Sequence, residues 1–137
     1  MFLILDTNIL FSFFWKSKVF RLVRKLRQIG YELTAPDFVF SELSALKEKI
    51  LKASKLSESE YEVLLIFLKY IVKEVSEDEY KEYLSKAESI SPHPKVVPLF
   101  ELSLALDKTP IWSREPRLKR QRFIKVLNDE EVEQLTK

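Results

Sequence analysis

Apolar residues along the chain occur either in short continuous runs or at helical spacing, and the two patterns alternate. Residues 2–5 are apolar throughout and are followed by Asp6, which is typical of a strand buried on both faces. In residues 18–30 apolar positions recur three and four residues apart, and Gly30 supplies a helix C-cap. The same criteria predict strands at 2–5, 31–35, 71–75, 109–113 and 123–127, and helices at 7–15, 18–30, 35–53, 57–70, 76–87, 98–107, 115–121 and 128–136.

Polar residues mark where several of these helices begin. Ser57 and Glu60 are spaced as a capping box, and Ser76 and Glu79 repeat the pattern. Asn128 is a suitable N-cap for the last helix. These signals support the predicted boundaries.

Short Ile-, Leu- and Val-rich strands that alternate with helices indicate a parallel sheet covered on both faces. We therefore expect a three-layer α/β/α fold with a central, mainly parallel five-stranded sheet. A chain of 137 residues without an internal repeat or linker fits one domain spanning residues 1–137. Ligand sites in such folds form beyond the carboxyl ends of the strands, where the strand order reverses.

The stretch Asp6-Thr7-Asn8 lies at such a strand end and has two interpretations. Thr7 or Asn8 can cap the following helix, or Asp6 can begin a site, because a carboxylate at the edge of a core is costly without a partner. Other carboxylates expected near this edge are Asp37, Glu42, Glu101 and Glu115. Converging carboxylates stay ionised around a cation, and oxygen ligands suit Mg²⁺ or Mn²⁺.

The composition excludes several classes of site. The chain has no cysteine, one histidine and one glycine, which excludes a thiolate zinc site and a glycine-rich phosphate loop and argues against a Ser-His-Asp triad. No apolar run has the length of a membrane span, and the N-terminus lacks the basic region of a signal peptide. We expect a cytoplasmic protein.

Basic residues are concentrated in two stretches, although the net charge is only +2. Residues 16–27 contain six basic and no acidic residues, and residues 114–125 contain six basic residues against Glu115. These stretches could contact nucleic acid or could be two solvated helix faces, and charge alone leaves both open.

The motifs LDTNIL, SEL and PIWSRE followed by RLKRQ, in this order along the whole chain, resemble the PIN domain, a metal-dependent ribonuclease fold. They are especially like archaeal members, many of which are VapC-type toxins. The resemblance implies that Asp6 is the first acid, supported by Thr7 and Asn8, and that Glu42 is the second. It also implies that Glu115 is the fourth acid and Ser113 its polar neighbour.

The third acid of the family pattern is missing. The family usually has Asp just before an apolar helix, and Val96 occupies that position here. Glu101 is a candidate replacement, although it lies roughly 140° around the helix from Val96. His93, in the preceding loop, is a second candidate.

The resemblance implies a Mg²⁺- or Mn²⁺-dependent endoribonuclease, a homodimer and an antitoxin partner. Its RNA-contacting residues would be Arg114, Arg117, Lys119, Arg120 and Arg122. The alternative is a catalytically impaired PIN-like domain that binds RNA or protein.

The aromatic residues near the N-terminus are expected in a core or a dimer contact rather than stacked on bases. These are Phe11, Phe13, Phe14 and Trp15, and Trp112 is expected in the core.

Overall fold

The computed structural model describes residues 1–15 and 18–137, so Lys16 of the first basic stretch lies outside the described residues. Within them the strands form a five-stranded sheet in the order β3-β2-β1-β4-β5, and each neighbouring pair is parallel. The strands are β1 (Phe2–Leu5), β2 (Glu32–Pro36), β3 (Val72–Val75), β4 (Ile111–Trp112) and β5 (Val126–Leu127). The predicted α/β class and parallel sheet are confirmed.

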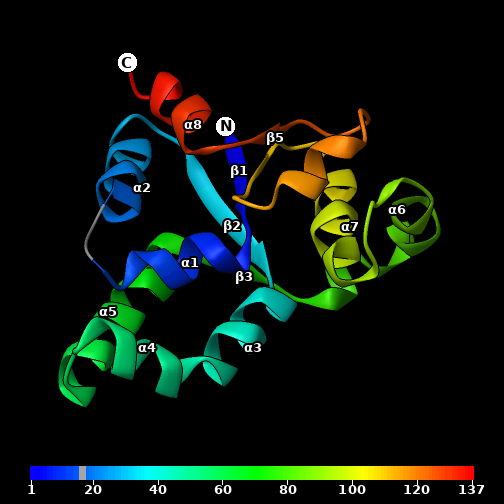
Figure 1. Cartoon of the computed structure of the whole chain (residues 1–137). Coiled ribbons are helices and arrows are strands. Elements are labelled where there is room, and N and C mark those ends of the chain that lie inside the picture. The colour runs from blue at the N-terminus through cyan, green and yellow to red at the C-terminus, as the bar shows by residue number, and fades with distance from the viewer. Residues whose placement is uncertain (16–17) are drawn as a thin grey trace.

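Helices cover both faces of this sheet (Figure 1). Helices α1, α2 and α5 lie on one side, and α6 and α7 lie on the other. The α-helices are α1 (Thr7–Phe13), α2 (Lys18–Gln28), α3 (Asp37–Ala45), α4 (Lys47–Ser54), α5 (Glu58–Ile71), α6 (Leu84–Ile90), α7 (Val97–Ala105) and α8 (Asp129–Leu135). Short 3₁₀ turns are η1 (Glu77–Glu79), η2 (Lys81–Tyr83), η3 (Pro94–Val96) and η4 (Pro116–Arg120).

The strand order reverses beside β1. The chain adds β2 and β3 on one side of β1 and then returns to place β4 and β5 on the other. Leu5 and Trp112 are register partners, so Asp6 and Ser113 follow neighbouring strands at the same edge. This is the switch point at which open α/β sheets bind ligands.

The centre of the sheet and the helix faces that cover it form a continuous apolar core. Leu3, Ile4 and Leu5 of β1 are fully buried, as a strand covered on both faces requires. Trp112 is also fully buried, which confirms its predicted place in the core. No helix in the described part of the chain is both long and apolar enough to cross a membrane.

Three predicted helices were wrong in detail because tertiary contacts override local pattern. The helix at 35–53 is divided at Leu46, whose ψ of 4° is not helical and whose side chain packs on the core. The helix at 76–87 is replaced by η1, η2 and α6, since the buried Tyr80 has a φ of −130° and donates a hydrogen bond to Asp37. The helix at 115–121 is the 3₁₀ turn η4.

The Ser76 side chain accepts from the N–H of Asp78 instead of forming the predicted box with Glu79. Helix α1 begins differently too, because Asp6 is its N-cap rather than Thr7 or Asn8.

Candidate active site

Asp6 joins the end of β1 to the start of α1 and is only 8% exposed. Its backbone N–H donates to the Trp112 carbonyl at 3.1 Å, which fixes it beside β4. One carboxylate oxygen accepts the Thr7 N–H at 2.7 Å, and the other accepts the Ser113 hydroxyl at 2.7 Å. Asp6 is therefore both a helix cap and a carboxylate held in place by the first residue of α1 and by the residue that follows β4.

The charge on Asp6 is disfavoured by its surroundings. Burial raises the pKa of Asp6, and the negative charges of Glu42 and Glu115 raise it further, while the hydrogen bonds from Ser113 and Thr7 lower it. The net direction is upward. A cation bound here would favour the ionised form.

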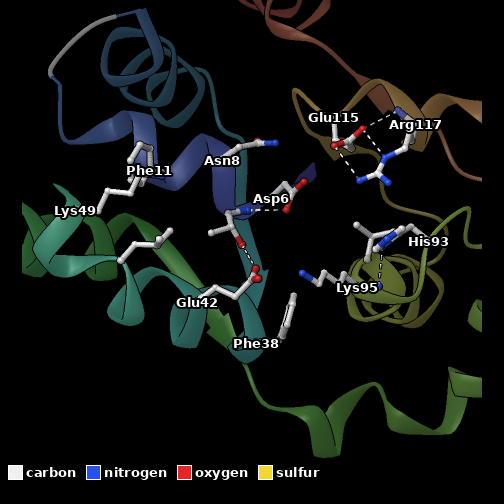
Figure 2. Close-up of a pocket in the computed structure, with 13 residues that line it drawn as sticks. Asp6, Asn8, Phe11, Phe38, Glu42, Lys49, His93, Lys95, Glu115 and Arg117 are labelled. Carbon is white, nitrogen blue, oxygen red and sulfur yellow. Dashed lines mark hydrogen bonds and ion pairs between the residues drawn. The ribbon is translucent and has the colours of Figure 1, made fainter. Parts of the chain in front are cut away.

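Glu42 reaches the same place from the helix that follows β2. The Thr7 hydroxyl donates to a Glu42 carboxylate oxygen at 2.6 Å, so Thr7 connects the carboxylates of Asp6 and Glu42 (Figure 2). Because the Thr7 hydroxyl has a single proton, it donates to only one oxygen of the Glu42 carboxylate. The second Glu42 oxygen remains available to a ligand.

Glu115 lies on the opposite side of the pocket and is turned toward Arg117 (Figure 2). It caps η4 by accepting the Arg117 N–H at 3.1 Å and also accepts the Arg117 Nε at 3.0 Å. These hydrogen bonds hold the pKa of Glu115 below its ordinary value, and the charge of His93 lowers it further. Glu115 therefore has a basic partner already.

Asn8 and Ser113 hold the backbone around these acids. The Asn8 side-chain oxygen accepts the Arg114 N–H at 3.3 Å, and the Ser113 hydroxyl oxygen accepts the Glu115 N–H at 3.0 Å. Both therefore fix the segment after β4 relative to α1.

The three acids line one pocket of about 340 Å³. Basic and apolar side chains complete it. Its full lining is Asp6, Thr7, Asn8, Phe11, Phe38, Glu42, Leu46, Lys49, His93, Lys95, Val96, Glu115 and Arg117. The structure thus brings together the first, second and fourth acids expected from the sequence, with Val96 beside them.

Sequence reasoning missed Lys49 and Lys95 as pocket residues. They come from α4 and η3, which are far apart in the chain. The one available signal for Lys49 was its spacing in the predicted helix. It lies three residues after Leu46, which also lines the pocket, and residues three apart share one side of a helix. His93 also lines the pocket, where its Nδ1 accepts the Lys95 N–H at 3.1 Å.

Glu101 does not replace the missing third acid and is not among the described residues that line the pocket. It lies on the buried side of α7, 6% exposed, near Glu77, Glu88 and Tyr80. Burial and the charges of Glu77 and Glu88 raise the pKa of Glu101 to about 7. The 140° turn between positions 96 and 101 explains why the two side chains point to different places.

Three of the five basic residues expected to contact RNA are engaged with acids. Arg114 binds Asp129 through Nε at 3.1 Å and Nη2 at 2.9 Å, Arg117 binds Glu115, and Lys119 pairs with Glu131. Arg120 and Arg122 are exposed and form no ion pair with any residue that the structure describes.

A metal ion would find two suitable carboxylates here. Among the described residues, no three His, Cys, Asp or Glu side chains stand close enough together to hold a metal ion. Mg²⁺, however, commonly keeps several waters and binds one or two protein carboxylates together with substrate phosphate. The Asp6 and Glu42 carboxylates, connected through Thr7 and open to the pocket, fit that kind of site.

Comparison with known proteins bears on the fold and the family of the chain. No curated protein is significantly similar to the chain in sequence. A solved structure, VapBC2 from Rickettsia felis bound to a DNA fragment from their promoter, contains a similar chain. The match covers 93% of this chain and 98% of that one, with a TM-score of 0.65 and 15% identity, and so shows a shared fold. The family model of the PIN domain matches residues 4–134, and the chain therefore belongs to the PIN domain family.

Proposed function

We propose that this protein is a metal-dependent endoribonuclease that hydrolyses phosphodiester bonds of single-stranded or structured RNA, as the toxin of a toxin–antitoxin pair. One observation carries the proposal. Asp6, Glu42 and Glu115 come from three separate elements and line one pocket at the switch point of the sheet. The PIN family, whose members are generally nucleases, supports the same reaction class.

Asp6 and Glu42 are the residues that would hold Mg²⁺ or Mn²⁺. The bound metal would lower the pKa of a water and stabilise charge on the phosphoryl oxygens. Thr7 and Ser113 keep the Asp6 carboxylate in one orientation through their hydrogen bonds. Asn8 fixes the segment that carries Glu115. Glu115 is close enough to influence Asp6 but must leave Arg117 to bind a ligand directly.

Basic residues of the pocket and of η4 are suited to the RNA backbone. Lys49, Lys95 and Arg117 line the pocket, where a phosphate would lie between them and the carboxylates. Arg120 and Arg122 extend the positive surface outside it. Arg114 and Lys119 would take part less, since acids already occupy them. Binding through these contacts should weaken as salt concentration rises.

Partners and location follow the toxin assignment. An antitoxin would bind this protein and cover the pocket, and the structural neighbour is itself a VapBC2 complex. Two copies of the chain would form a homodimer. The expected compartment is the cytoplasm, where the RNA substrate is found.

A second candidate function is favoured by the same pocket. Val96 occupies the position of the third acid, and Arg117 already neutralises Glu115. Two free carboxylates can bind a metal too weakly for turnover. The domain would then bind RNA or protein without cutting.

The decisive experiment is cleavage of a pool of single-stranded RNAs with Mn²⁺ or Mg²⁺, comparing the wild type with Asp6→Asn and Asp107→Asn. Asparagine also caps helices, so Asp6→Asn should fold normally. Asp107 is exposed and outside the pocket, and its variant is the matched control. We expect cleavage by the wild type and Asp107→Asn only.

Two other results would count against the nuclease. Equal cutting by Asp6→Asn would identify a contaminating enzyme. RNA binding that is unchanged in EDTA, without cleavage under any condition, would support the binding module.

A further inference from the structure

A second hollow lies next to the candidate active site. Its volume is about 320 Å³, and it is lined by Phe11, Ser12, Trp15 and Arg114. Phe11 also lines the carboxylate pocket, so the two spaces share a wall. On the side of the carboxylate pocket, the Lys49 ammonium lies 5.9 Å from the centroid of the Phe11 ring.

The four aromatic residues near the N-terminus divide into two groups. Phe13 and Phe14 are buried in the core, as the sequence predicted. Trp15 is 37% exposed and Phe11 is half-buried, with their ring centroids 4.8 Å apart. Phe11 packs partly against the core, and both side chains line the hollow, where the exposed part of the Trp15 indole is available to a flat ligand.

The hollow is also lined by the guanidinium of Arg114, which is held in a fixed position. The Arg114 Nη1 donates to the Ser12 hydroxyl at 2.6 Å, and its Nε and Nη2 donate to Asp129. The buried Trp112 Nε1 donates to the other oxygen of Asp129 at 3.0 Å, which fixes the acid as well. Two aromatic side chains and a positively charged guanidinium therefore line the hollow, and the guanidinium is fixed before any ligand arrives.

We propose that this hollow binds one unpaired nucleobase of the RNA strand whose phosphate occupies the adjoining carboxylate pocket. This inference rests on the proposed function, because it takes the ligand of the first pocket to be RNA. Unstacked bases bind to aromatic rings and to guanidinium planes, and such contacts tolerate all four bases. The shared Phe11 wall suits a base and a phosphate of one strand.

Tryptophan fluorescence can measure this contact directly. The chain has two tryptophans, and Trp112 is fully buried, so quenching by a bound base reports on Trp15. The probes are a short oligouridylate, an abasic sugar-phosphate chain of equal length and a nucleoside monophosphate, all measured in EDTA to prevent cleavage. Variants are Trp15→Leu and, as a matched control, Phe2→Leu, an exposed aromatic residue at the other end of β1.

We expect the oligouridylate to quench the wild type and Phe2→Leu, with the abasic chain quenching neither. In titration calorimetry, which does not depend on the indole signal, Trp15→Leu should bind the oligouridylate about tenfold more weakly or worse, while its affinity for the abasic chain stays unchanged. Equal affinities of Trp15→Leu and the wild type for the oligouridylate would overturn the inference, even if both cut RNA.

The nucleoside monophosphate separates this inference from the proposed function. If the wild type neither binds nor cuts RNA, the proposed function fails. Calorimetric binding of the monophosphate that Trp15→Leu loses and Phe2→Leu keeps would still support a nucleobase site. If the wild type does not bind the monophosphate either, the nucleobase site is excluded together with the proposed function.

Discussion

At the scale of single residues, Asp6 combines a structural role as the N-cap of α1 with a place in the candidate active site. Its oxygens accept hydrogen bonds from Thr7 and Ser113, which fixes the carboxylate between the start of α1 and the end of β4. Each carboxylate oxygen keeps a further lone pair that a ligand in the pocket could use. The cost of burying this charge is visible as the raised pKa of Asp6. Adding or removing charge nearby should therefore alter the site measurably.

Val96→Asp should strengthen metal binding, because it adds a carboxylate to a pocket that already contains Asp6 and Glu42. The position is half-buried and precedes α7 as its N-cap, where Asp is well tolerated. A tenfold gain in Mn²⁺ affinity would add about 1.4 kcal/mol of stabilisation at saturating metal. The measurement is the shift in unfolding temperature on adding Mn²⁺. Val97→Asp is the control, because Val97 does not line the pocket. Equal shifts in both variants would contradict the prediction.

Glu101→Gln should stabilise the protein at pH 8 and change little at pH 4. Burial raises the pKa of Glu101 to about 7 from 4.5. An acid with a raised folded pKa contributes stability below its unfolded pKa, and this is lost as the pH rises from 4.5 to 7. Each unit corresponds to about 1.4 kcal/mol, so this rise in pKa sets an upper limit of about 3.5 kcal/mol, and solvent screening should reduce the gain at pH 8 to about 2 to 3 kcal/mol. Urea unfolding across this pH range tests it, with the exposed Glu82→Gln as control. Equal stabilisation at pH 4 would point to a cause other than charge.

At the scale of elements, the sequence predicted strand and helix positions where local signals and packing agree. The run at 2–5 forms β1, and Asn128 begins α8 with a capping box. Prediction failed where a distant contact decides the backbone, as with Tyr80, which is held by Asp37 from another element. The residues of the candidate site divide in the same way between local signals and distant contacts. The acids come from motifs, whereas Lys49 and Lys95 meet only through tertiary folding.

Ser57→Ala should lower the free energy of unfolding by about 1 kcal/mol. The Ser57 hydroxyl accepts the Glu60 N–H at 3.1 Å, and the Glu60 carboxylate accepts the Ser57 N–H at 2.9 Å. Removing the hydroxyl leaves the first turn of α5 without this half of the capping box. Ser59→Ala, in the same turn but outside the box, is the control for urea unfolding. A loss of the same size in both variants would show that the box contributes nothing.

At the scale of the whole molecule, one apolar surface is largely exposed, although the Phe67 ring within it contacts Phe13 and Phe20. Val63, Ile66, Phe67 and Tyr70, called here the α5 stripe, recur at helical spacing on α5 and are exposed, Ile66 at 68% and Tyr70 at 84%. Glu62 and Lys69 flank it seven residues apart, on one side of the helix. Two α5 helices packed antiparallel about a twofold axis would place each Glu62 beside the partner's Lys69. The stripe is therefore complementary to itself, as a homodimer interface must be.

Ile66→Lys should convert the expected homodimer to a monomer, because the twofold axis would bring two lysine charges together within an apolar contact. Sedimentation equilibrium should give twice the chain mass of 16.3 kDa for the wild type and one chain mass for the variant. Leu84→Lys, at an exposed leucine of α6 outside the stripe, should remain dimeric. Reversing the charge with Lys69→Glu should weaken the dimer, and adding Glu62→Lys should restore it. If the wild type sediments as a monomer, the proposed dimer interface is excluded. If the Ile66→Lys variant remains a dimer, the dimer interface lies on another face of the protein.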